Sequence, residues 1–485
     1  MATILFAIFA FLILKNIEYN NINLSSSIIN TGKVENQPKI AKAFEIKGVV
    51  SNNFGKNIGK DIDNDGDIDS AVIIDNTIGY SICMDKSNKI YVTGYTNSND
   101  TTSDLIIIKI NQNGIIDNSF GVNGYVTLNN IAGGNSHDIG YSINIDNHGK
   151  LYVTGISWNG NNNDLIVIRL NQNGTLDKSF GSKGYIVLNS IAGGNGHDFG
   201  QSIHIDKAGK IYVTGYSDSK IHFKDLIVIK LNYDGTLDRS FGSNGKAVFH
   251  NIAGGNLSDY GNSIHTDNTG NIYITGSSDS HGNAQDLIVI KLKPNGTLDT
   301  SFNSKGYITF NNIAGNNTID QGNSIFVDND GKIYVTGLSY RPGGKNGNSD
   351  LVVIKLNPNG KLDKSFGSNG FFTLHNVAGG NSFDESKSIH LDKDGKIYIT
   401  GYSWNGNSKD LIAIRLTPNG NLDNSFGSKG KIVINNITGK ESNEEGYSIH
   451  INSSKVHIIG SSNTLNNDNN NQITQKENLI LIQIE

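Results

Sequence analysis

Apolar and polar residues alternate in short runs along almost the whole chain, and these runs recur with a fixed period. The segment that begins at Gly140 reads GYSINIDNHGKLYVTGISWNG and continues, after Asn163, with DLIVIRLNQNGTLDKSFGSKGYIVLNS. Self-similarity at a fixed spacing indicates a repeat architecture in which each unit is one supersecondary motif. Equivalent units begin near residues 79, 140, 200, 261, 322, 386 and 446, so the sequence predicts seven units of about sixty residues.

Each unit predicts four β-strands. In the unit at Gly200, a D-x-x-G turn separates an alternating strand at 202–206 from a second strand at 210–217. The third strand, at 225–232, is almost continuously apolar, which is typical of a strand that is buried on both faces of its sheet. An Asn-Gly or Asp-Gly turn and the loop L-D-x-S-F-G-x-x-G then lead to the fourth strand. Four antiparallel strands per unit predict a propeller blade; the alternative, a β-solenoid, has shorter rungs without such hairpin turns.

The two ends of the repeat region complement each other. The seventh unit ends at Glu485 directly after its third strand, whereas an S-F-G-like loop at 52–60 and an apolar strand at 70–75 precede the first unit. Propellers commonly complete one blade with strands from both ends of the chain. We therefore expect an all-β fold, a single seven-bladed β-propeller of four-stranded blades at 44–485, with its last blade closed by the N-terminal segment.

Composition agrees with many short strands and excludes one class of partner. The chain has 57 glycines, only 5 prolines and 36% hydrophobic residues, which fits strands joined by tight turns. The net charge is −5 and no run of Lys or Arg is present, so a nucleic-acid partner is not expected. We expect a monomer.

The N-terminus predicts export. Residues 2–14 form an uninterrupted apolar run that ends at Lys15, which suits the core of a signal peptide and is short for a membrane span. We interpret 1–19 as a signal peptide, with an uncleaved anchor as the alternative, and 20–43 as a flexible lead-in. The single cysteine, Cys83, excludes an intrachain disulfide. The expected location is the periplasm, the cell surface or the medium of a bacterium, and no transmembrane bundle is expected.

The repeated motif N-G-x-L-D-x-S-F-G-x-x-G supports a family resemblance. It recurs six times, with Asn303 in place of its first glycine after phenylalanine in the fourth unit. The unit resembles the "delta sixty" repeat, which is similar to the seven-bladed propeller repeats of exported bacterial proteins. The resemblance covers roughly 52–485. It implies the fold but little about activity, because one fold hosts many functions.

The acidic segment DIDNDGDID at 61–69 predicts a calcium site. Carboxylates at alternate positions, with a glycine at the sixth, place hard oxygen ligands around one cation. The spacing resembles the calcium loop of FG-GAP propeller repeats, and it departs from an EF-hand because Val72 stands where a bidentate Glu is required. An acidic turn without an ion is the alternative. The resemblance implies side-chain ligands from Asp61, Asp63, Asp65 and Asp69, with the carbonyl of Asp67, and a structural role for the ion.

Two sets of repeated polar residues predict structural roles rather than chemistry. Histidines recur in the first strand at 204, 265, 390 and 450, but Cys83, Asn144 and Phe326 occupy the same position in other units, which favours packing between blades over a metal site. The third strand opens with an Asp and carries a Lys or Arg five residues later in six units. An odd spacing places the two on opposite faces of a strand, so we expect them to bridge blades or cap turns.

The least repetitive segments predict the binding face. They are the connections from the second to the third strand and from the fourth strand to the next unit, which open on the same face of a propeller. Exposed aromatic rings beside polar side chains are typical of a surface that binds a carbohydrate or a peptide, although the rings can instead pack on their own loops. The candidate ligand-binding residues are Trp158, Tyr340, Trp404, His137 and His197, accompanied by Asp138, Asp198, Asp259, Asp320 and Asp384.

Three functions are compatible with these observations. The first is a binding, adhesion or scaffold module that holds a protein or a glycan on its loop face. The second is a propeller enzyme of the lyase, lactonase or quinoprotein kind with an ion at the mouth of the channel. That function calls for a singular inward cluster of His, Glu, Arg or Tyr; none is evident among such similar units, and glutamate is scarce before Glu441. We therefore favour a non-enzymatic role and expect no catalytic residue. The third function is a passive spacer or surface coat.

Overall fold

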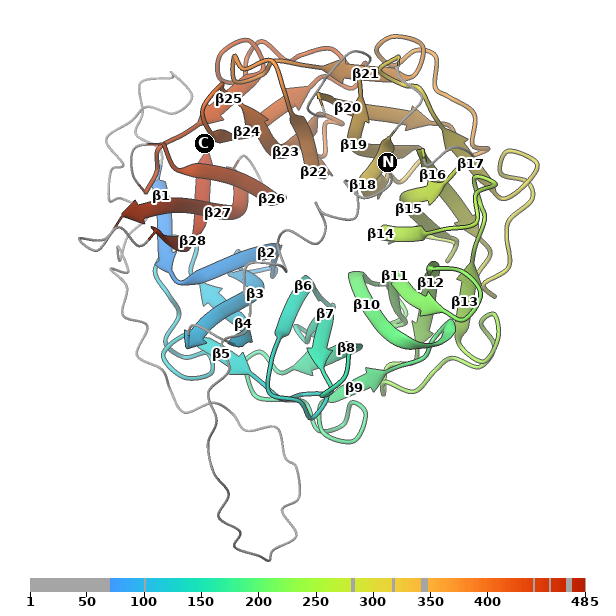
Figure 1. The fold of residues 1–485 in the computed structure, drawn as a ribbon, viewed down its shortest axis with the longest axis vertical. Helices are drawn as coiled ribbons and strands as arrows, with labels where there is room; N and C mark the ends of the chain where they lie inside the picture. Colours follow the sequence, from blue (N-terminus) through green and yellow to red (C-terminus); the bar gives the residue numbers. More distant parts are fainter. Residues whose placement is uncertain are drawn as a thin grey trace, which may run out of the picture. The chain divides into compact units, whose positions relative to one another are not determined.

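The computed structural model describes residues 70–99, 102–280, 284–315, 319–341, 348–438, 441–452, 455–467 and 473–484. In these ranges the strands form seven four-stranded antiparallel sheets. The sheets stand as blades around a common axis, and the first strand of each blade is the innermost (Figure 1). The predicted all-β, seven-bladed propeller is confirmed. Among the described residues no helix has the length and apolarity needed to cross a bilayer.

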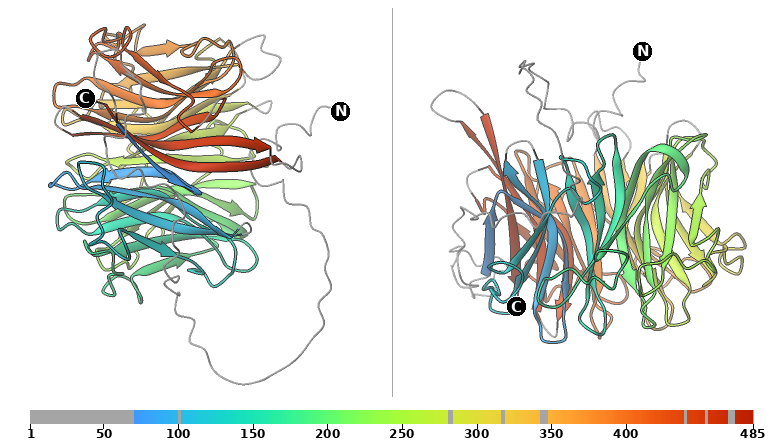
Figure 2. Two further views of the ribbon diagram at one scale, coloured as in Figure 1. Left: turned by 90° about the vertical axis from the view of Figure 1, so that its left-hand side faces the viewer. Right: turned by 90° about the horizontal axis from the view of Figure 1, so that it is seen from below.

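Each blade takes four strands that are consecutive in the chain, except the last. The first three blades consist of β2 (Thr77–Met84), β3 (Ile90–Asn99), β4 (Thr102–Ile110) and β5 (Tyr125–Leu128); β6 (Asp138–Ile145), β7 (Leu151–Trp158), β8 (Asn163–Leu170) and β9 (Tyr185–Leu188); and β10 (Gly193–Ile205), β11 (Ile211–Ser219), β12 (Lys224–Leu231) and β13 (Lys246–Phe249). The next three consist of β14 (Asp259–Thr266), β15 (Ile272–Asp279), β16 (Gln285–Leu292) and β17 (Tyr307–Phe310); β18 (Asp320–Val327), β19 (Ile333–Tyr340), β20 (Ser349–Leu356) and β21 (Phe371–Leu374); and β22 (Asp384–Leu391), β23 (Ile397–Trp404), β24 (Lys409–Leu416) and β25 (Lys431–Ile434). The strands of each blade run between the two faces of the ring (Figure 2).

The seventh blade joins the two ends of the described chain. It consists of β26 (Asn443–Asn452), β27 (Lys455–Asn467), β28 (Ile473–Ile484) and β1 (Ser70–Asp75). Strand β1 pairs antiparallel with β28, with Ala71 opposite Ile482 and Ile74 opposite Leu479. Val72 and Ile74 are buried in a cluster that also contains side chains of β3 and β4 in the first blade. The predicted closure by the N-terminal segment is confirmed.

The hydrophobic core lies between neighbouring blades. One cluster combines Leu105 and Ile107 of β4 with Leu151 and Val153 of β7 in the next blade, and all four side chains are fully buried. The third strand of each blade therefore packs on both sides, which explains why these strands read as continuous apolar runs.

The loop before each fourth strand fastens one blade to the next. In the second blade, Asp177 accepts hydrogen bonds from the amide and hydroxyl of Ser179 and forms an ion pair with the buried Arg169 at 3.0 Å. Arg169 also donates to the backbone carbonyl of Tyr233 in the third blade. Lys230 repeats this bridge by donating to the carbonyl of Pro294 at 3.0 Å. The cations of the third strands thus bridge blades, as expected from their repetition.

Candidate functional site at one mouth of the ring

Both predicted sets of connections lie on one face of the ring, which we call the loop face. In the second blade, Gly134 of the incoming connection donates its amide to the carbonyl of Trp158 at 2.9 Å. Between blades, the amide of Asn163 donates to Nδ1 of His197 at 3.2 Å. The predicted cooperation of the two sets of loops therefore has a physical basis, because they contact each other within and between blades.

A β-bulge interrupts the first strand of every blade close to the loop face. The register with the second strand shifts by one residue between a glycine, or Ser386 in the sixth blade, and the next serine, as between Gly140 and Ser142. A bulge leaves one residue unpaired and redirects its side chain. These seven residues, which we call the mouth ring, are Tyr80, Tyr141, Gln201, Asn262, Asn323, Lys387 and Tyr447.

Members of the mouth ring contact one another around the axis. The ring of Tyr80 lies 5.2 Å from that of Tyr447 and 5.5 Å from that of Tyr141, centroid to centroid, so the bulge residues of three successive blades touch. Asn262 donates from Nδ2 to the carbonyl of Gly322 at 2.9 Å, and Asn323 donates to the carbonyl of Ser386 at 2.8 Å, each in the following blade. Three tyrosines of the mouth ring are therefore in direct contact, and its two asparagines each bind the backbone of the following blade.

Aromatic rings extend the mouth ring on one side. Tyr141 stacks on Phe199 of β10 at 6.3 Å, Phe199 stacks on Tyr216 of β11 at 4.6 Å, and Tyr216 meets Tyr260 of β14 edge-on at 5.1 Å. The ammonium of Lys224 lies over the Tyr216 ring, 4.6 Å from its centroid. All these rings are half-buried, so each keeps part of its surface open to solvent. They form an aromatic arc from the seventh blade to the fourth.

Next to the seventh-blade end of this arc, the mouth carries a cluster of charged groups from the sixth and seventh blades. The ammonium of Lys387 lies 2.5 Å from Oε1 of Glu385, and that of Lys409 lies 2.7 Å from Oε1 of Glu445. The hydroxyl of Tyr402 donates to Oε2 of Glu385, and Lys409 lies 4.2 Å from the centroid of the Tyr402 ring. The sequence showed no singular inward cluster of His, Glu, Arg or Tyr, and this group of Glu, Lys and Tyr side chains was not anticipated from it.

The environment fixes the protonation of these groups. Burial opposes the ionisation of Glu385, but the charge and hydrogen bond of Lys387, with the Tyr402 hydroxyl, hold the pKa of that carboxyl below its usual value. Burial likewise lowers the pKa of Lys387, yet Glu385 outweighs it and the net shift is upward. Burial and neighbouring tyrosines raise the pKa of Tyr80 well above its usual value. At neutral pH the mouth therefore presents an ionised pair beside neutral phenols.

The predicted aromatic residues lie at the loop face, each at the end of its second strand. Trp158 ends β7, where its indole packs close to Gly134, and its amide donates to the carbonyl of His137 at 2.9 Å. Trp404 ends β23 and makes the matching backbone contacts with Gly380 and Phe383. Both side chains are half-buried, so they pack on their own loops while keeping an exposed part.

The other predicted residues divide between the mouth and its rim. Tyr340 ends β19, and burial, together with the negative charge of Glu385, raises the pKa of its phenol. His197 lies 6.1 Å from Phe199 of the aromatic arc, centroid to centroid. His137 is half-buried in the second blade, and burial lowers the pKa of its imidazole. The structure thus brings Tyr340 and His197 near the mouth. The five residues remain predicted ligand contacts.

The aspartates at the start of the first strands have a scaffold role, which corrects their assignment to the binding face. Asp138 is fully buried, and its carboxylate accepts the amides of Asn130 at 2.9 Å and Ile131 at 3.3 Å. Burial raises the pKa of this carboxyl to about 7. The same arrangement holds the other incoming connections through Asp198, Asp259, Asp320, Asp384 and, in the seventh blade, Glu444.

Two sequence predictions concern residues away from the mouth. The acidic segment that contains Asp61, Asp63, Asp65, Asp67 and Asp69 lies outside the described residues, so calcium binding remains a prediction. The first-strand histidines pack ring against ring between blades: His204 lies 4.5 Å from His265, and His390 lies 4.9 Å from His450. Burial lowers the pKa of His204 to about 4, so this imidazole is neutral, as packing requires.

The mouth ring was not singled out by sequence analysis, although the sequence contains a signal for it. Each first strand begins with a short motif in which a glycine or serine is followed by one variable residue and then by an invariant serine. The variable residue is the bulge. The alternation of apolar and polar residues would assign the bulge residue to one face of a regular strand. Its contacts with residues of adjacent blades are therefore known only from the structure.

Two open depressions lie elsewhere on the described residues. One is lined by Phe326, Tyr334, Leu391 and Lys393, among the D-x-x-G turns of the fifth and sixth blades. The other runs along β17 and β21 and is lined by Phe310, Ile313 and Phe371. Neither contains a residue of the mouth ring or a predicted ligand contact.

Sequence comparisons agree with the repeat architecture. A "Domain of unknown function (DUF5122) beta-propeller" model matches residues 86–120, 149–180, 209–241, 268–302, 329–366 and 393–426. A "Beta-propeller repeat" model, SBBP, matches residues 188–221 and 249–283. No curated protein sequence matches the chain.

Solved structures show a distant likeness. Polysaccharide lyase Uly1 is 11% identical with a TM-score of 0.45, and the match covers 84% of this chain and 90% of the lyase. An ulvan lyase of family PL25, solved with a bound saccharide, is 13% identical with a TM-score of 0.43, covering 80% of this chain and 91% of that one. A glucose dehydrogenase is 10% identical with a TM-score of 0.36, covering 71% and 96%. At these values we base no functional inference on the likeness.

Proposed function

We propose that this repeat β-propeller is a binding module that holds a carbohydrate chain on its loop face, across the mouth ring. The observation that carries the proposal is a contrast between positions. Residues that hold the scaffold, such as the buried Asp138 and its counterparts, recur in nearly every blade, whereas the seven bulge positions hold four residue types, Tyr, Gln, Asn and Lys. A scaffold alone does not require that difference, because all seven bulges have the same backbone environment.

The side chains at the mouth suit a sugar polymer. Half-buried phenol rings offer apolar faces for stacking and hydroxyl groups at their edges for hydrogen bonds. The amide side chains of Asn262 and Asn323 point around the same ring. The ionised Glu385 and Lys387 lie in the sixth blade, next to the seventh-blade end of the arc, and suit charged or hydroxyl substituents. An extended chain lying across the mouth would meet both kinds of surface.

The test uses substitutions that the fold already tolerates. Asparagine is the natural bulge residue in two blades, so Tyr80→Asn, Tyr141→Asn and Tyr447→Asn remove the aromatic faces without new strain. We expect each to lose about 1 kcal/mol of stacking and the triple variant to bind about a hundredfold more weakly. Affinity electrophoresis and calorimetry on a panel of neutral and acidic polysaccharides measure this. Tyr233→Asn, at an exposed ring in a turn before a fourth strand, is the matched control and leaves binding unchanged.

Two outcomes would contradict the proposal. One is polysaccharide binding that survives the triple variant, which would remove the mouth ring from the binding surface. The other is the absence of binding across the panel together with binding of a polypeptide, which would make the ligand a protein. Either conclusion requires that every variant keeps the melting temperature of the parent protein, because a loss of binding then does not reflect unfolding.

The charged cluster gives the enzymatic alternative a specific basis. A carboxylate that accepts a phenol proton and adjoins an ammonium group has the components of acid–base catalysis. If the module also cleaves its ligand, Glu385→Gln abolishes the appearance of new chain ends while binding persists. Binding without cleavage in the parent protein leaves the module non-enzymatic.

Export and calcium belong to the same proposal. An extracellular or surface location follows from the apolar run at 2–14, and a closure-stabilising calcium ion follows from the aspartates at 61–69. Both would suit a protein that meets polysaccharides outside the cell, where calcium is abundant.

A further inference from the structure

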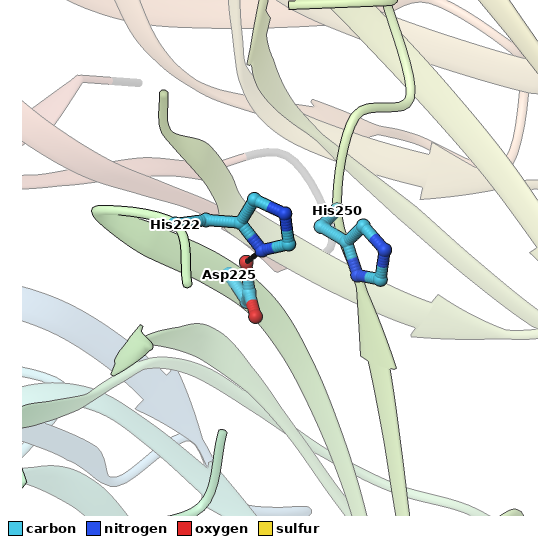
Figure 3. Close-up of side chains that lie close together, drawn as sticks. All are labelled: His222, Asp225 and His250. Carbon is cyan, nitrogen blue, oxygen red and sulfur yellow. Dashed lines mark ion pairs between the residues drawn. The ribbon is translucent and has the colours of Figure 1, made fainter. Parts of the chain in front are cut away.

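The third blade carries a cluster of three metal-ligating side chains on the loop face. His222 lies in the connection between β11 and β12, Asp225 lies in β12, and His250 follows β13 directly. One ligand atom from each lies within 4.8 Å of the other two. The two imidazole rings stack, with centroids 4.5 Å apart, and both adjoin the carboxylate (Figure 3).

Two buried atoms of this cluster, one in Asp225 and one in His222, make no hydrogen bond. Asp225 is 4% exposed, and its Oδ1 makes no hydrogen bond. Nδ1 of His222 is also buried without one, and it faces Oδ1 of Asp225 at 3.3 Å. A buried carboxylate oxygen that has no donor is costly, and an ion is one recognised explanation for it.

The equivalent aspartates of other blades have other neighbours, and only in the third blade do two imidazoles adjoin this carboxylate among the described residues. The equivalent carboxylate of Asp164 accepts from Nδ2 of Asn159 at 2.9 Å, and that of Asp410 accepts from Nδ2 of Asn405 at 2.7 Å. In the fifth blade, Nε of Arg341 lies 2.6 Å from Asp350. An amide thus serves the aspartate in the second and sixth blades and a guanidinium adjoins it in the fifth, where Oδ1 of Asp350, like Oδ1 of Asp286 in the fourth blade, makes no hydrogen bond. Two imidazoles take that place in the third blade.

We propose that His222, Asp225 and His250 bind a zinc ion. Two imidazole nitrogens and one carboxylate oxygen form a mixed set that Zn²⁺ favours, in tetrahedral geometry. Asp225 is fixed in its strand, and His250 is exposed, so its ring can turn to complete the set. The described residues supply three protein ligands, so water would take the fourth position. The site is separate from the mouth ring and does not depend on its proposed ligand.

The experiment titrates the full chain with zinc chloride after chelator treatment. Excess calcium is present throughout, so that the aspartates at 61–69 do not contribute. We expect one zinc ion per chain by calorimetry, and a cobalt-substituted sample with the visible absorption of a tetrahedral site. His222→Ala combined with His250→Ala should weaken zinc binding by at least about tenfold to a hundredfold. His375→Ala changes the exposed histidine at the equivalent position of the fifth blade and should leave binding unchanged.

Three results would overturn the proposal. They are the absence of saturable zinc binding to the parent, equal affinity in the double-histidine variant, and an octahedral cobalt spectrum. The histidines are preferred to Asp225 for substitution because they lie in loops, so the fold survives their loss. Lowering the pH should release the ion, because protons compete for imidazole nitrogen.

Discussion

Single glycines determine what each first strand presents to the axis. In the third blade, a Cβ at Gly215 of β11 would lie 1.8 Å from the carbonyl oxygen of Phe199, two residues before the bulge residue Gln201. The same close approach recurs at Gly155 against Ile139 and at Gly276 against Tyr260. Because no side chain fits there, the glycine allows the first strand to bulge and redirect its next side chain. The mouth ring therefore depends on residues that are not part of it.

A methyl group at this position should therefore destabilise the blade. We expect Gly215→Ala to lower the free energy of unfolding by about 3 kcal/mol, because the strands must separate to admit the new Cβ. Gly160→Ala is the control: it has a φ of 106° but nothing within 4 Å of the added atom, so it costs only about 1 kcal/mol of backbone strain. Urea unfolding of both variants measures the difference. Equal losses would show that sterics at the bulge are not responsible.

At this scale the sequence identified repeated residues but not their surroundings. The aspartates that open the first strands were assigned to the binding face because they follow polar loops. Asp138 instead turns inward to two backbone amides, a contact that depends on the folded path of its loop. The proposed zinc site could not be predicted for a related reason: His250 is separated from His222 by the whole of β12 and β13, and only the sheet brings them together.

Among the elements, the loop before each fourth strand contributes most to joining the blades. Its aspartate accepts the serine two residues later, and its phenylalanine is buried: Phe120, Phe180, Phe241, Phe302 and Phe366 are fully buried. The hydroxyl of Ser240 and the ammonium of Lys210 lower the pKa of Asp238 to about 2. Ser365 and Lys332 lower that of Asp363 to about 2. These carboxylates stabilise the fold only while ionised.

This arrangement predicts loss of stability in acid. The folded pKa of Asp238, about 2, lies below the value of about 3.9 for an unfolded aspartate. Its contribution is therefore complete above about pH 4 and disappears as the pH falls towards 2. We expect Asp238→Asn to lower the melting temperature at pH 7 and to reduce its decline between pH 5 and 2, as thermal melts can measure. Asp394→Asn, at an exposed turn, is the control; an equal effect there would contradict the explanation.

Element type and order followed from the sequence because each strand has its own periodicity and each turn its own glycine. The third strands were recognised as buried on both sides, and their packing between blades bears this out. The residues at which strands end were harder to predict from the sequence. Trp158, Tyr340 and Trp404 were placed in loops, but each ends a strand, because the backbone ladder continues through them to the loop face.

At the scale of the whole molecule, the ring depends on one pairing between the ends of the described chain. All six residues of β1 pair with β28, and Lys476 adds an ion pair with Asp75 at 2.9 Å. Without β1, strand β28 would expose an unpaired edge, and Val72 and Ile74 would leave the core between the seventh and first blades.

Two truncations test this closure. Deletion of residues 1–75 should open the ring, lower the urea midpoint and promote association through the exposed edge of β28. Deletion of residues 1–43 removes only the predicted leader and lead-in, and should leave both properties unchanged. Equilibrium unfolding and analytical ultracentrifugation measure these outcomes. A stable monomer after the longer deletion would show that the other six blades hold the ring by themselves.

The seven bulges also bear on how such a protein can change over generations. Each bulge residue is set by a single codon, and the residue at its position differs among the blades while the serine that follows it is constant. Duplication of a blade copies the scaffold intact, after which one substitution at a bulge would change the proposed binding surface without disturbing the fold. The seven bulge positions can therefore be substituted independently of one another. We expect related proteins to differ in their ligands according to the residues at these seven positions.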